Sequence, residues 1–166
     1  MLIIRPEQEQ DHDAIAAVTT QAFAASEHSD QTEAAIVAAL RRAGALSLSL
    51  VAHDGALVIG HVAFSPVTID EKNVRWFGLG PVSVHPGRQG GGVGGALIRQ
   101  GLDQLRALGA DGCVVLGDPG YYRRFGFEND RDLRYDGAPP EYFMRISFGA
   151  RARVGRVEYH SGFYGH

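Results

Sequence analysis

The chain of 166 residues is 45% hydrophobic and 21% charged, which is typical of one soluble globular domain. Its formal net charge of −3 excludes a global positive field that would draw it to nucleic acid or to anionic membranes, so we expect neither as a partner. No apolar segment is long enough for a secretion signal or a membrane-spanning helix, so we expect a cytoplasmic protein. The single cysteine, Cys113, lies in an apolar run without a disulfide partner, which predicts a buried core thiol.

The N-terminal part of the chain predicts a strand followed by two helices. Residues 2–5 form a short apolar strand that Pro6 closes. The second helix begins near Asp30 and stops at Gly44. The buried faces of the two helices follow from helical spacing and consist of Ile15, Val18 and Ala22 in the first and of Ile36, Leu40 and Ala43 in the second.

Three strands, a helix and a further strand form the middle of the chain. We expect the three strands at residues 46–50, 58–69 and 74–84, with turns at residues 54–55 and 70–73. Gly80 and Pro81 interrupt the third strand and predict a bulge there. A glycine-rich loop then opens a helix of about 16 residues that Gly109 ends, and residues 113–116 form the next strand.

The remaining chain predicts a short helix near residues 121–124 and edge strands at residues 142–148 and 156–159. An antiparallel meander, a crossover helix and a further strand indicate an α+β (mixed α/β) fold with a mostly antiparallel, twisted central sheet and flanking helices. We expect residues 1–166 to form a single domain, because no linker or repeat interrupts them. The C-terminal edge strands could pair between two chains, which leaves a homodimer open.

The glycine-rich segment is a candidate pyrophosphate cradle. A strand runs into a loop that opens a helix, whose first turn has unpaired N–H groups and a positive dipole end. Glycine lets a phosphate approach this backbone closely. Gly90, Gly92 and Gly95 also satisfy the dinucleotide pattern G-x-G-x-x-G, so a nucleotide-dependent oxidoreductase is an alternative. That pattern belongs to the first unit of a long parallel sheet, whereas three antiparallel-looking strands precede it here.

The same segment resembles a motif of a known family. Gln89-x-x-Gly92-x-Gly94 is similar to the Q/R-x-x-G-x-G/A acetyl-CoA motif of the GNAT acetyltransferases, and residues 122–127 resemble that family's Tyr-x-x-x-Gly-Phe element. The order of elements also fits as far as about Phe127. The resemblance implies a GNAT-like sheet with a splayed strand pair. It also implies an N-acetyltransferase that moves an acetyl group from acetyl-CoA to a primary amine, on a small molecule or a peptide, by direct attack in a ternary complex.

The resemblance also assigns the site residues. It implies that the backbone beside the bulge holds the pantetheine arm and that the glycine loop takes the pyrophosphate. The coenzyme-binding set is then Val82, Ser83, Val84, Gln89, Gly90, Gly91, Gly92, Val93, Gly94 and Gly95. Tyr122 would protonate the leaving thiolate as the general acid. Only the family spacing distinguishes Tyr122 from its neighbour Tyr121.

The general base stays open. Many members of the family carry a glutamate on the bulged strand, but residues 76–79 offer no carboxylate. The candidates are a chain of water molecules, Asp118 and Glu33, although both acids also suit a role as helix caps. The missing base keeps a non-catalytic acyl-CoA sensor on the same fold as a further hypothesis.

Three smaller features complete the expectations. The seven histidines show no metal-ligand spacing, so we predict no metal site. Arg123 and Arg124 either meet the phosphates of the coenzyme or form a solvated surface pair. The aromatic residues 159–164 either pack on the sheet or line an acceptor pocket.

Overall fold

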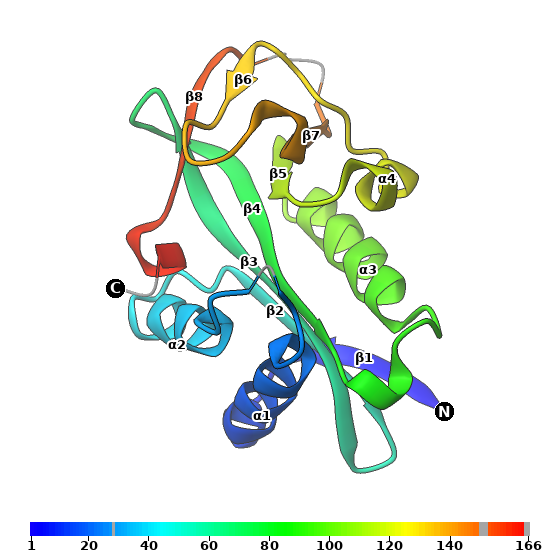
Figure 1. Ribbon diagram of the computed structural model, residues 1–166. Helices are drawn as coiled ribbons and strands as arrows, with labels where there is room; N and C mark the ends of the chain where they lie inside the picture. Colours follow the sequence, from blue (N-terminus) through cyan, green and yellow to red (C-terminus); the bar gives the residue numbers. More distant parts are fainter. Residues whose placement is uncertain (28, 150–152, 165–166) are drawn as a thin grey trace.

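The computed structural model describes residues 1–27, 29–149 and 153–164, and these form a single sheet system with helices on both faces (Figure 1). The helices are α1 (His12–Phe23), α2 (Glu33–Arg42), α3 (Val93–Ala107) and α4 (Pro119–Tyr122). The strands are β1 (Leu2–Pro6), β2 (Leu48–Asp54), β3 (Leu57–Ile69), β4 (Lys72–Val84), β5 (Gly112–Leu116), β6 (Leu133–Arg134), β7 (Phe143–Ser147) and β8 (Gly155–Tyr159). No helix among the described residues is long and apolar enough to cross a membrane.

The sheet is mostly antiparallel, as the sequence predicts. Its main path is β1-β2-β3-β4-β5-β7, while β8 pairs with β3 and with the short β6. Among the strands that the structure describes, only the pairs β4–β5 and β6–β8 are parallel. The first predicted turn is confirmed, because Asp54 and Leu57 pair across it. Asp70 and Glu71 form the second turn with φ of 51° and 64°. The strand expected at residues 46–50 begins two residues later and extends to Asp54.

The predicted bulge lies in the middle of β4. Val62 pairs with Val82 and Phe64 pairs with Leu79, so two residues of β4, Gly80 and Pro81, face the single residue between Val62 and Phe64. The parallel pairing of β4 with β5 ends at Leu79, immediately before the bulge. Beyond this point the two strands diverge (Figure 1). The structure therefore contains the splayed strand pair that the family resemblance implies.

The helices cover the sheet with faces that differ in part from those predicted. In α1, Ile15 and Val18 are buried as expected, but Ala22 is only partly buried. In α2, Val37 and Leu40 face the core, whereas Ile36 is partly buried and Ala43 is exposed. The expected stripe of α2 is confirmed at Leu40 but not at Ile36 or Ala43, because the buried face of the helix consists of Val37, Ala39 and Leu40. This arrangement leaves Ile36 and Glu33, three positions apart, on a different face.

The start of α2 also differs from the expectation. Its N-cap is Thr32, and the Asp30 carboxylate accepts bonds from the Thr32 N–H at 3.2 Å and from the Thr32 hydroxyl at 2.5 Å. Asp30 therefore forms a turn before the helix and does not cap it.

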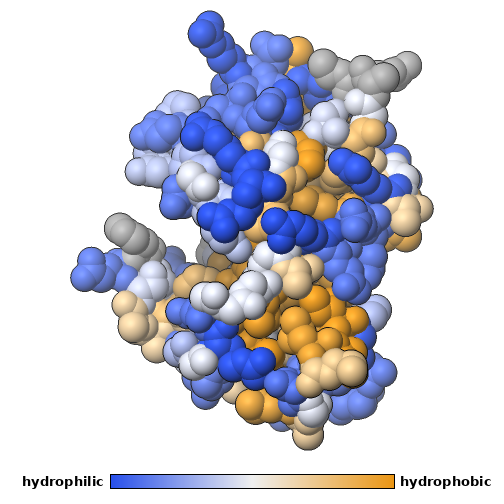
Figure 2. Space-filling model, turned by 90° about the vertical axis from the view of Figure 1, so that its right-hand side faces the viewer, coloured by the Kyte–Doolittle hydropathy of each residue, from blue (hydrophilic) through white to orange (hydrophobic). Residues whose placement is uncertain are grey.

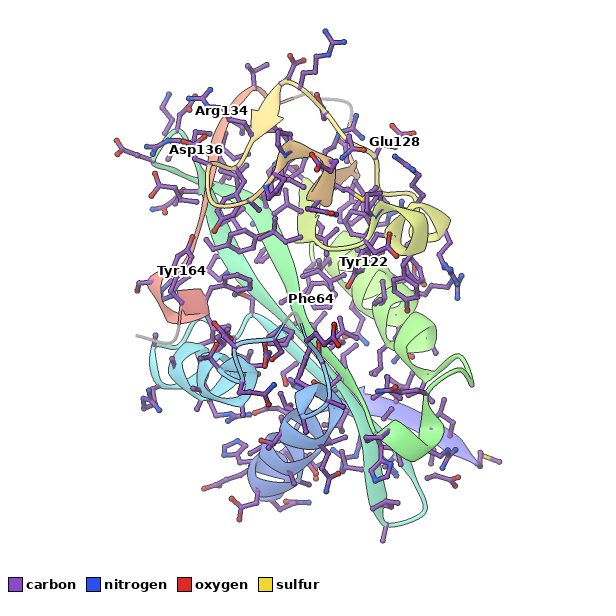
Figure 3. The ribbon with its side chains drawn as sticks, in the orientation of Figure 1. Phe64, Tyr122, Glu128, Arg134, Asp136 and Tyr164 are labelled. Atoms are coloured by element: carbon purple, nitrogen blue, oxygen red, sulfur yellow. The ribbon has the colours of Figure 1, made fainter. Side chains whose placement is uncertain are left out.

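The opposite face of the sheet carries α3, which contacts β3 very closely. A Cβ on Gly101 of α3 would lie 2.3 Å from the buried ring of Phe64, so only glycine fits at this contact (Figure 3). Gly109 follows the helix with φ of 83°, which is the predicted stop signal.

The C-terminal segment folds back across the sheet to the end of α2. Tyr159 in β8 is buried, and a Cβ on Gly78 of β4 would lie 2.4 Å from its ring. Phe163, in the turn Ser161–Tyr164, stacks on Tyr159 with ring centroids 4.2 Å apart. A Cβ on Gly162 would lie 3.1 Å from the Leu40 side chain, so this turn packs directly on α2. The aromatic tail therefore packs on the sheet, which was one of the two expected roles.

Candidate active site

A cavity of about 530 Å³ opens where β4 and β5 separate. It lies between the end of β4, the glycine loop, the first turn of α3 and the α4 segment. Figure 2, which views the molecule from the side of α3, shows that the surface is hollowed between the upper and lower parts of the molecule. The lining residues are Ala22, Phe23, Val82, Val84, Arg88, Gln89, Gly90, Gly92, Val93, Gly94, Gly95, Arg99, Tyr121, Tyr122, Arg124 and Phe125.

The backbone of Val82 and Val84 points into the gap left by β5. The His85 N–H donates to the Ile59 carbonyl at 2.8 Å, so residue 85 bonds toward β3. Bonding direction alternates along an antiparallel strand, and therefore Val82 and Val84 present their N–H and C=O groups to the other side. The Gln89 side-chain amide donates to the Val84 carbonyl at 3.1 Å from that side. These groups can bind an extended ligand in the way that an added strand would.

The first turn of α3 is a cradle of unpaired donors. Gly90 and Gly92 adopt φ of 83° and 85°, a left-handed conformation that glycine reaches without strain. Gly92 occupies the N-cap position, so the chain turns directly into the helix. Within the described part of the chain, no group accepts a hydrogen bond from the N–H groups of Gly91 to Gly95. Such a helix start attracts an anion.

Positive charge is concentrated around this cradle. Arg88, Arg99 and Arg124 line the cavity, and none of the other described lining residues is acidic. Arg99 lies over the Phe125 ring at 4.9 Å, and Arg124 lies over the Tyr121 ring at 4.6 Å. These stacked guanidinium groups are suited to phosphate, which they can bind through paired donors. Arg123 instead donates to Asn129 at 3.2 Å and is not among the lining residues.

A second cavity, of about 290 Å³, lies next to the first. It is formed by the ends of α1 and α2, the bulge of β4, the end of β5, α4 and the C-terminal turn. Its lining residues are Phe23, Glu33, Ile36, Leu79, Gly80, Pro81, Val82, Leu116, Tyr122 and Phe163. Phe23, Val82 and Tyr122 line both cavities, so the two cavities meet at these three residues.

Tyr122 and Tyr121 occupy different positions relative to this junction. Tyr122 lies on α4 (Figure 3), and its hydroxyl makes no hydrogen bond to any other described residue. A Cβ on Gly117 would lie 2.4 Å from the Tyr122 ring, so this glycine makes room for the ring at the end of β5. Burial raises the pKa of Tyr122 to about 12. The Tyr121 hydroxyl lies instead beside Gly94, 3.4 Å from the position of a Cβ, over the anion cradle.

The two candidate bases are placed differently. The Asp118 carboxylate accepts from the Gly120 N–H at 2.9 Å and caps α4, as its helix-cap interpretation predicts, and it lines neither cavity. Glu33 lines the second cavity, and its Oε1 accepts from the Ser29 hydroxyl at 2.6 Å. The expectation that Glu33 caps α2 was wrong, because its carboxylate bonds to Ser29 and not to the helix backbone.

Most of the residues predicted to bind a coenzyme line the first cavity, but two do not. Ser83 is buried on the opposite face of β4, and its hydroxyl has no hydrogen-bond partner among the described residues. Gly91 lies in the loop outside the lining set. The sequence analysis did not single out Phe23, Arg88, Arg99 or Phe125 for this site. Of these, Arg99 could have been found, because it lies one helical turn beyond Gly95 on the same helix face.

The remaining sequence expectations concern a thiol and metals. Cys113 is buried in β5, and burial raises the pKa of its thiol, so it remains an inert core residue. Within residues 1–27, 29–149 and 153–164, no group of three or more His, Cys, Asp or Glu side chains is arranged to hold a metal ion.

The bulged, splayed sheet with an anion cradle at the start of α3 defines the GNAT class of acyltransferase folds. The family model described as an acetyltransferase (GNAT) domain matches residues 3–129. The chain is 37% identical to YhbS of Escherichia coli K12, named an uncharacterized N-acetyltransferase, over 98% of each protein. The crystal structure of a GNAT family acetyltransferase from Brucella melitensis in complex with acetyl-CoA superposes with a TM-score of 0.88 and 52% identity over 98% of both chains. The crystal structure of Escherichia coli YhbS in complex with CoA superposes with a TM-score of 0.88 and 36% identity, over 98% of this chain and 92% of the other.

The chain therefore belongs to the GNAT acetyltransferase family, and the protein is an acyltransferase. The family resemblance noted in the sequence is confirmed. The oxidoreductase alternative is not favoured, because the glycine loop follows an antiparallel meander and is not the first turn of a long parallel sheet.

Proposed function

We propose that the protein transfers the acetyl group of acetyl-CoA to a primary amine in a ternary complex. The observation that carries this proposal is the position of Tyr122, which lines both the cationic cavity and the neighbouring cavity at the gap between β4 and β5. The relatives from Brucella melitensis and Escherichia coli, whose structures contain acetyl-CoA and CoA, support the choice of coenzyme.

The first cavity would hold the coenzyme through groups of two kinds. The outward-facing backbone of Val82 and Val84 would pair with the amides of the pantetheine arm. The free N–H groups of residues 91–95 would bind the pyrophosphate, and Arg88, Arg99 and Arg124 would neutralise the remaining phosphate charge. In this arrangement the thioester would reach the junction with the second cavity.

The reaction would then proceed in one attack. The lone pair of the neutral amine nitrogen attacks the thioester carbonyl carbon, the C–N bond forms and the C–S bond breaks. The nitrogen then gives up one proton to a general base, for which the candidates are a water molecule and Glu33, the one of the two candidate acids that lines the second cavity. The Val82 N–H faces the gap and would stabilise the negative charge that develops on the carbonyl oxygen. The Tyr122 hydroxyl would give its proton to the departing sulfur of CoA. With a pKa of about 12, Tyr122 is protonated at neutral pH and is therefore a proton donor and not a base.

The test is the substitution Tyr122→Phe, which removes the hydroxyl and keeps the ring that packs against Phe127, with centroids 6.0 Å apart. We expect kcat and kcat/KM to fall together by about 10²-fold, because the lost interaction forms only in the transition state. Acetyl-CoA affinity, measured by isothermal titration, should change little. Steady-state rates come from the release of free thiol with a reactive amine.

Tyr121→Phe is the control. Its hydroxyl lies over the anion cradle and away from the second cavity, so its rate should fall less than that of Tyr122→Phe. Equal rates for the two variants, both close to that of the unchanged protein, would contradict the role assigned to Tyr122. A protein that binds acetyl-CoA but releases no thiol with any amine would instead be a non-catalytic acyl-CoA sensor.

A further inference from the structure

The two cavities carry opposite charge. Three arginines line the coenzyme cavity, whereas Glu33 is the one charged residue among the described residues that line the second cavity. Apart from Glu33 and the hydroxyl of Tyr122, the side chains there are apolar. A ligand that enters this cavity therefore meets a single fixed negative charge in apolar surroundings.

The Glu33 carboxylate is held in place and still has a free oxygen. The Ser29 hydroxyl donates to Oε1 at 2.6 Å, and this bond restrains the carboxylate. Oε2 forms no hydrogen bond or ion pair with any described residue. Glu33 also lies in the first turn of α2, where the helix dipole favours negative charge. These features leave an oriented anion with an open acceptor position.

The apolar wall of the cavity comes from three distant parts of the chain. Ile36 lies one turn after Glu33 on α2, Leu116 ends β5, and Phe163 comes from the C-terminal turn. A Cβ on Gly80 would lie 3.9 Å from the Phe163 ring, so the ring reaches the bulge of β4. The cavity volume of about 290 Å³ is near the lower end of the usual range for small-ligand sites.

From these observations we infer that the acceptor is a primary amine carried on a compact apolar group. Glu33 binds the ammonium form of this amine, which loses one proton to water or to Glu33 before its nitrogen attacks the thioester, and Ile36, Leu116 and Phe163 enclose its apolar part. This inference rests on the proposed acetyl transfer and specifies its substrate class. A second ammonium group would enter apolar surroundings without a partner, and a carboxylate would meet Glu33; both are costly.

An amine panel with the unchanged protein tests the substrate class directly. We would compare 2-phenylethylamine and 3-methylbutylamine with 1,4-diaminobutane, spermidine and phenylalanine at a fixed acetyl-CoA concentration. Phenylalanine differs from 2-phenylethylamine by one carboxylate, so this pair isolates the effect of added negative charge. We expect kcat/KM for the two apolar monoamines to exceed that for the other three by at least tenfold.

The role of Glu33 is tested by Glu33→Gln, which keeps the shape of the side chain and removes its charge. We expect the KM for 2-phenylethylamine to rise at least tenfold while the acetyl-CoA Kd, measured by isothermal titration, stays within twofold. Glu27→Gln is the matched control, because Glu27 is exposed and lines neither cavity, and its KM should not change. Phe163→Ala should lower kcat/KM for the apolar amines and should also leave the acetyl-CoA Kd unchanged.

The outcomes separate this inference from the proposed function. Efficient acetylation of diamines or of phenylalanine, with poor use of the apolar monoamines, would overturn the substrate class and leave acetyl transfer intact. An unchanged KM in Glu33→Gln would overturn the role of Glu33. If the protein bound no acetyl-CoA, or bound it and acetylated no amine, the proposed function itself would fail.

Discussion

A buried histidine of β3, next to β4, should make the free energy of unfolding depend on pH between about pH 4 and pH 6.5. His61 of β3 is fully buried and pairs with Ser83 of β4. Its Nε2 lies 2.8 Å from the Ser49 hydroxyl, and its Nδ1 has no hydrogen-bond partner among the described residues. Burial lowers the pKa of His61 to about 4, against the smaller opposing effect of the Glu7 charge. The folded protein therefore keeps this ring neutral.

The sign and the size of the effect follow from that pKa. The unfolded chain binds a proton on His61 below about pH 6.5, whereas the folded chain does so only below about pH 4. Between these values the unfolded state holds more protons, so stability is greatest above pH 6.5 and falls as the pH is lowered. The expected loss from His61 is about 2 kcal/mol between pH 7.5 and 5 and about 3 kcal/mol once pH 4 is passed.

Urea unfolding, followed by the fluorescence of the single buried Trp76, measures this loss. We would determine the free energy of unfolding at pH 7.5, 6 and 5 for the unchanged protein and for His61→Gln. Ion pairs and hydrogen bonds lower the pKa values of Glu7, Asp11 and Asp130. The interval from pH 7.5 to 5 lies above the range in which protonation of these carboxylates strongly changes the free energy of unfolding. If both proteins lost the same stability between pH 7.5 and 5, the reasoning about His61 would be refuted.

Two further predictions concern glycines of α3. Gly94→Asp should raise the acetyl-CoA Kd by at least 10²-fold in isothermal titration, because it puts a negative charge in the anion cradle. Gly94→Ala is the control: its Cβ has room at 3.4 Å from its neighbours, so this variant should bind acetyl-CoA far more tightly than Gly94→Asp. Gly101→Ala should lower the free energy of unfolding by about 1–3 kcal/mol in urea titrations, because the clash with the buried Phe64 ring outweighs the gain of about 1 kcal/mol in helix propensity. Gly95→Ala should not destabilise the protein, because its Cβ would lie 3.2 Å from the flexible end of Arg99 and 3.7 Å, an ordinary contact distance, from the Phe125 ring.

The sequence predicted correctly those features of the fold that depend on a few consecutive residues. The bulge at Gly80 and Pro81, the glycine cradle and the stop at Gly109 are each determined by local backbone chemistry, and each lies where it was predicted. The position of the Ser83 side chain could have been predicted from the sequence. Side chains alternate along a strand, so if Val82 and Val84 line a cavity, the side chain between them must point to the other face.

The second cavity was beyond the reach of the sequence because distant segments form it. Glu33, Leu116 and Phe163 come together only because the C-terminal turn packs on α2 and Tyr159 fits over Gly78. The apolar residues of α2 permit two helix phases, and only packing selects the one that buries Val37 and turns Ile36 toward the cavity. Periodicity therefore predicted that α2 exists but not which residues it presents to the site.

In the proposed arrangement, the distribution of charge would keep the coenzyme and the acceptor in their own cavities. An acidic acceptor would be attracted to Arg88, Arg99 and Arg124 and would compete with the coenzyme phosphates, while Glu33 would repel it from the second cavity. A cationic amine would be repelled by these arginines and attracted to Glu33. Tyr122, which lies where the two cavities meet, carries no charge at neutral pH, because the pKa of a tyrosine is ordinarily about 10 and burial raises it here to about 12. A neutral donor at this position can give its proton to sulfur without attracting either substrate into the wrong cavity. A charged lysine or glutamate at the same position would attract one of them.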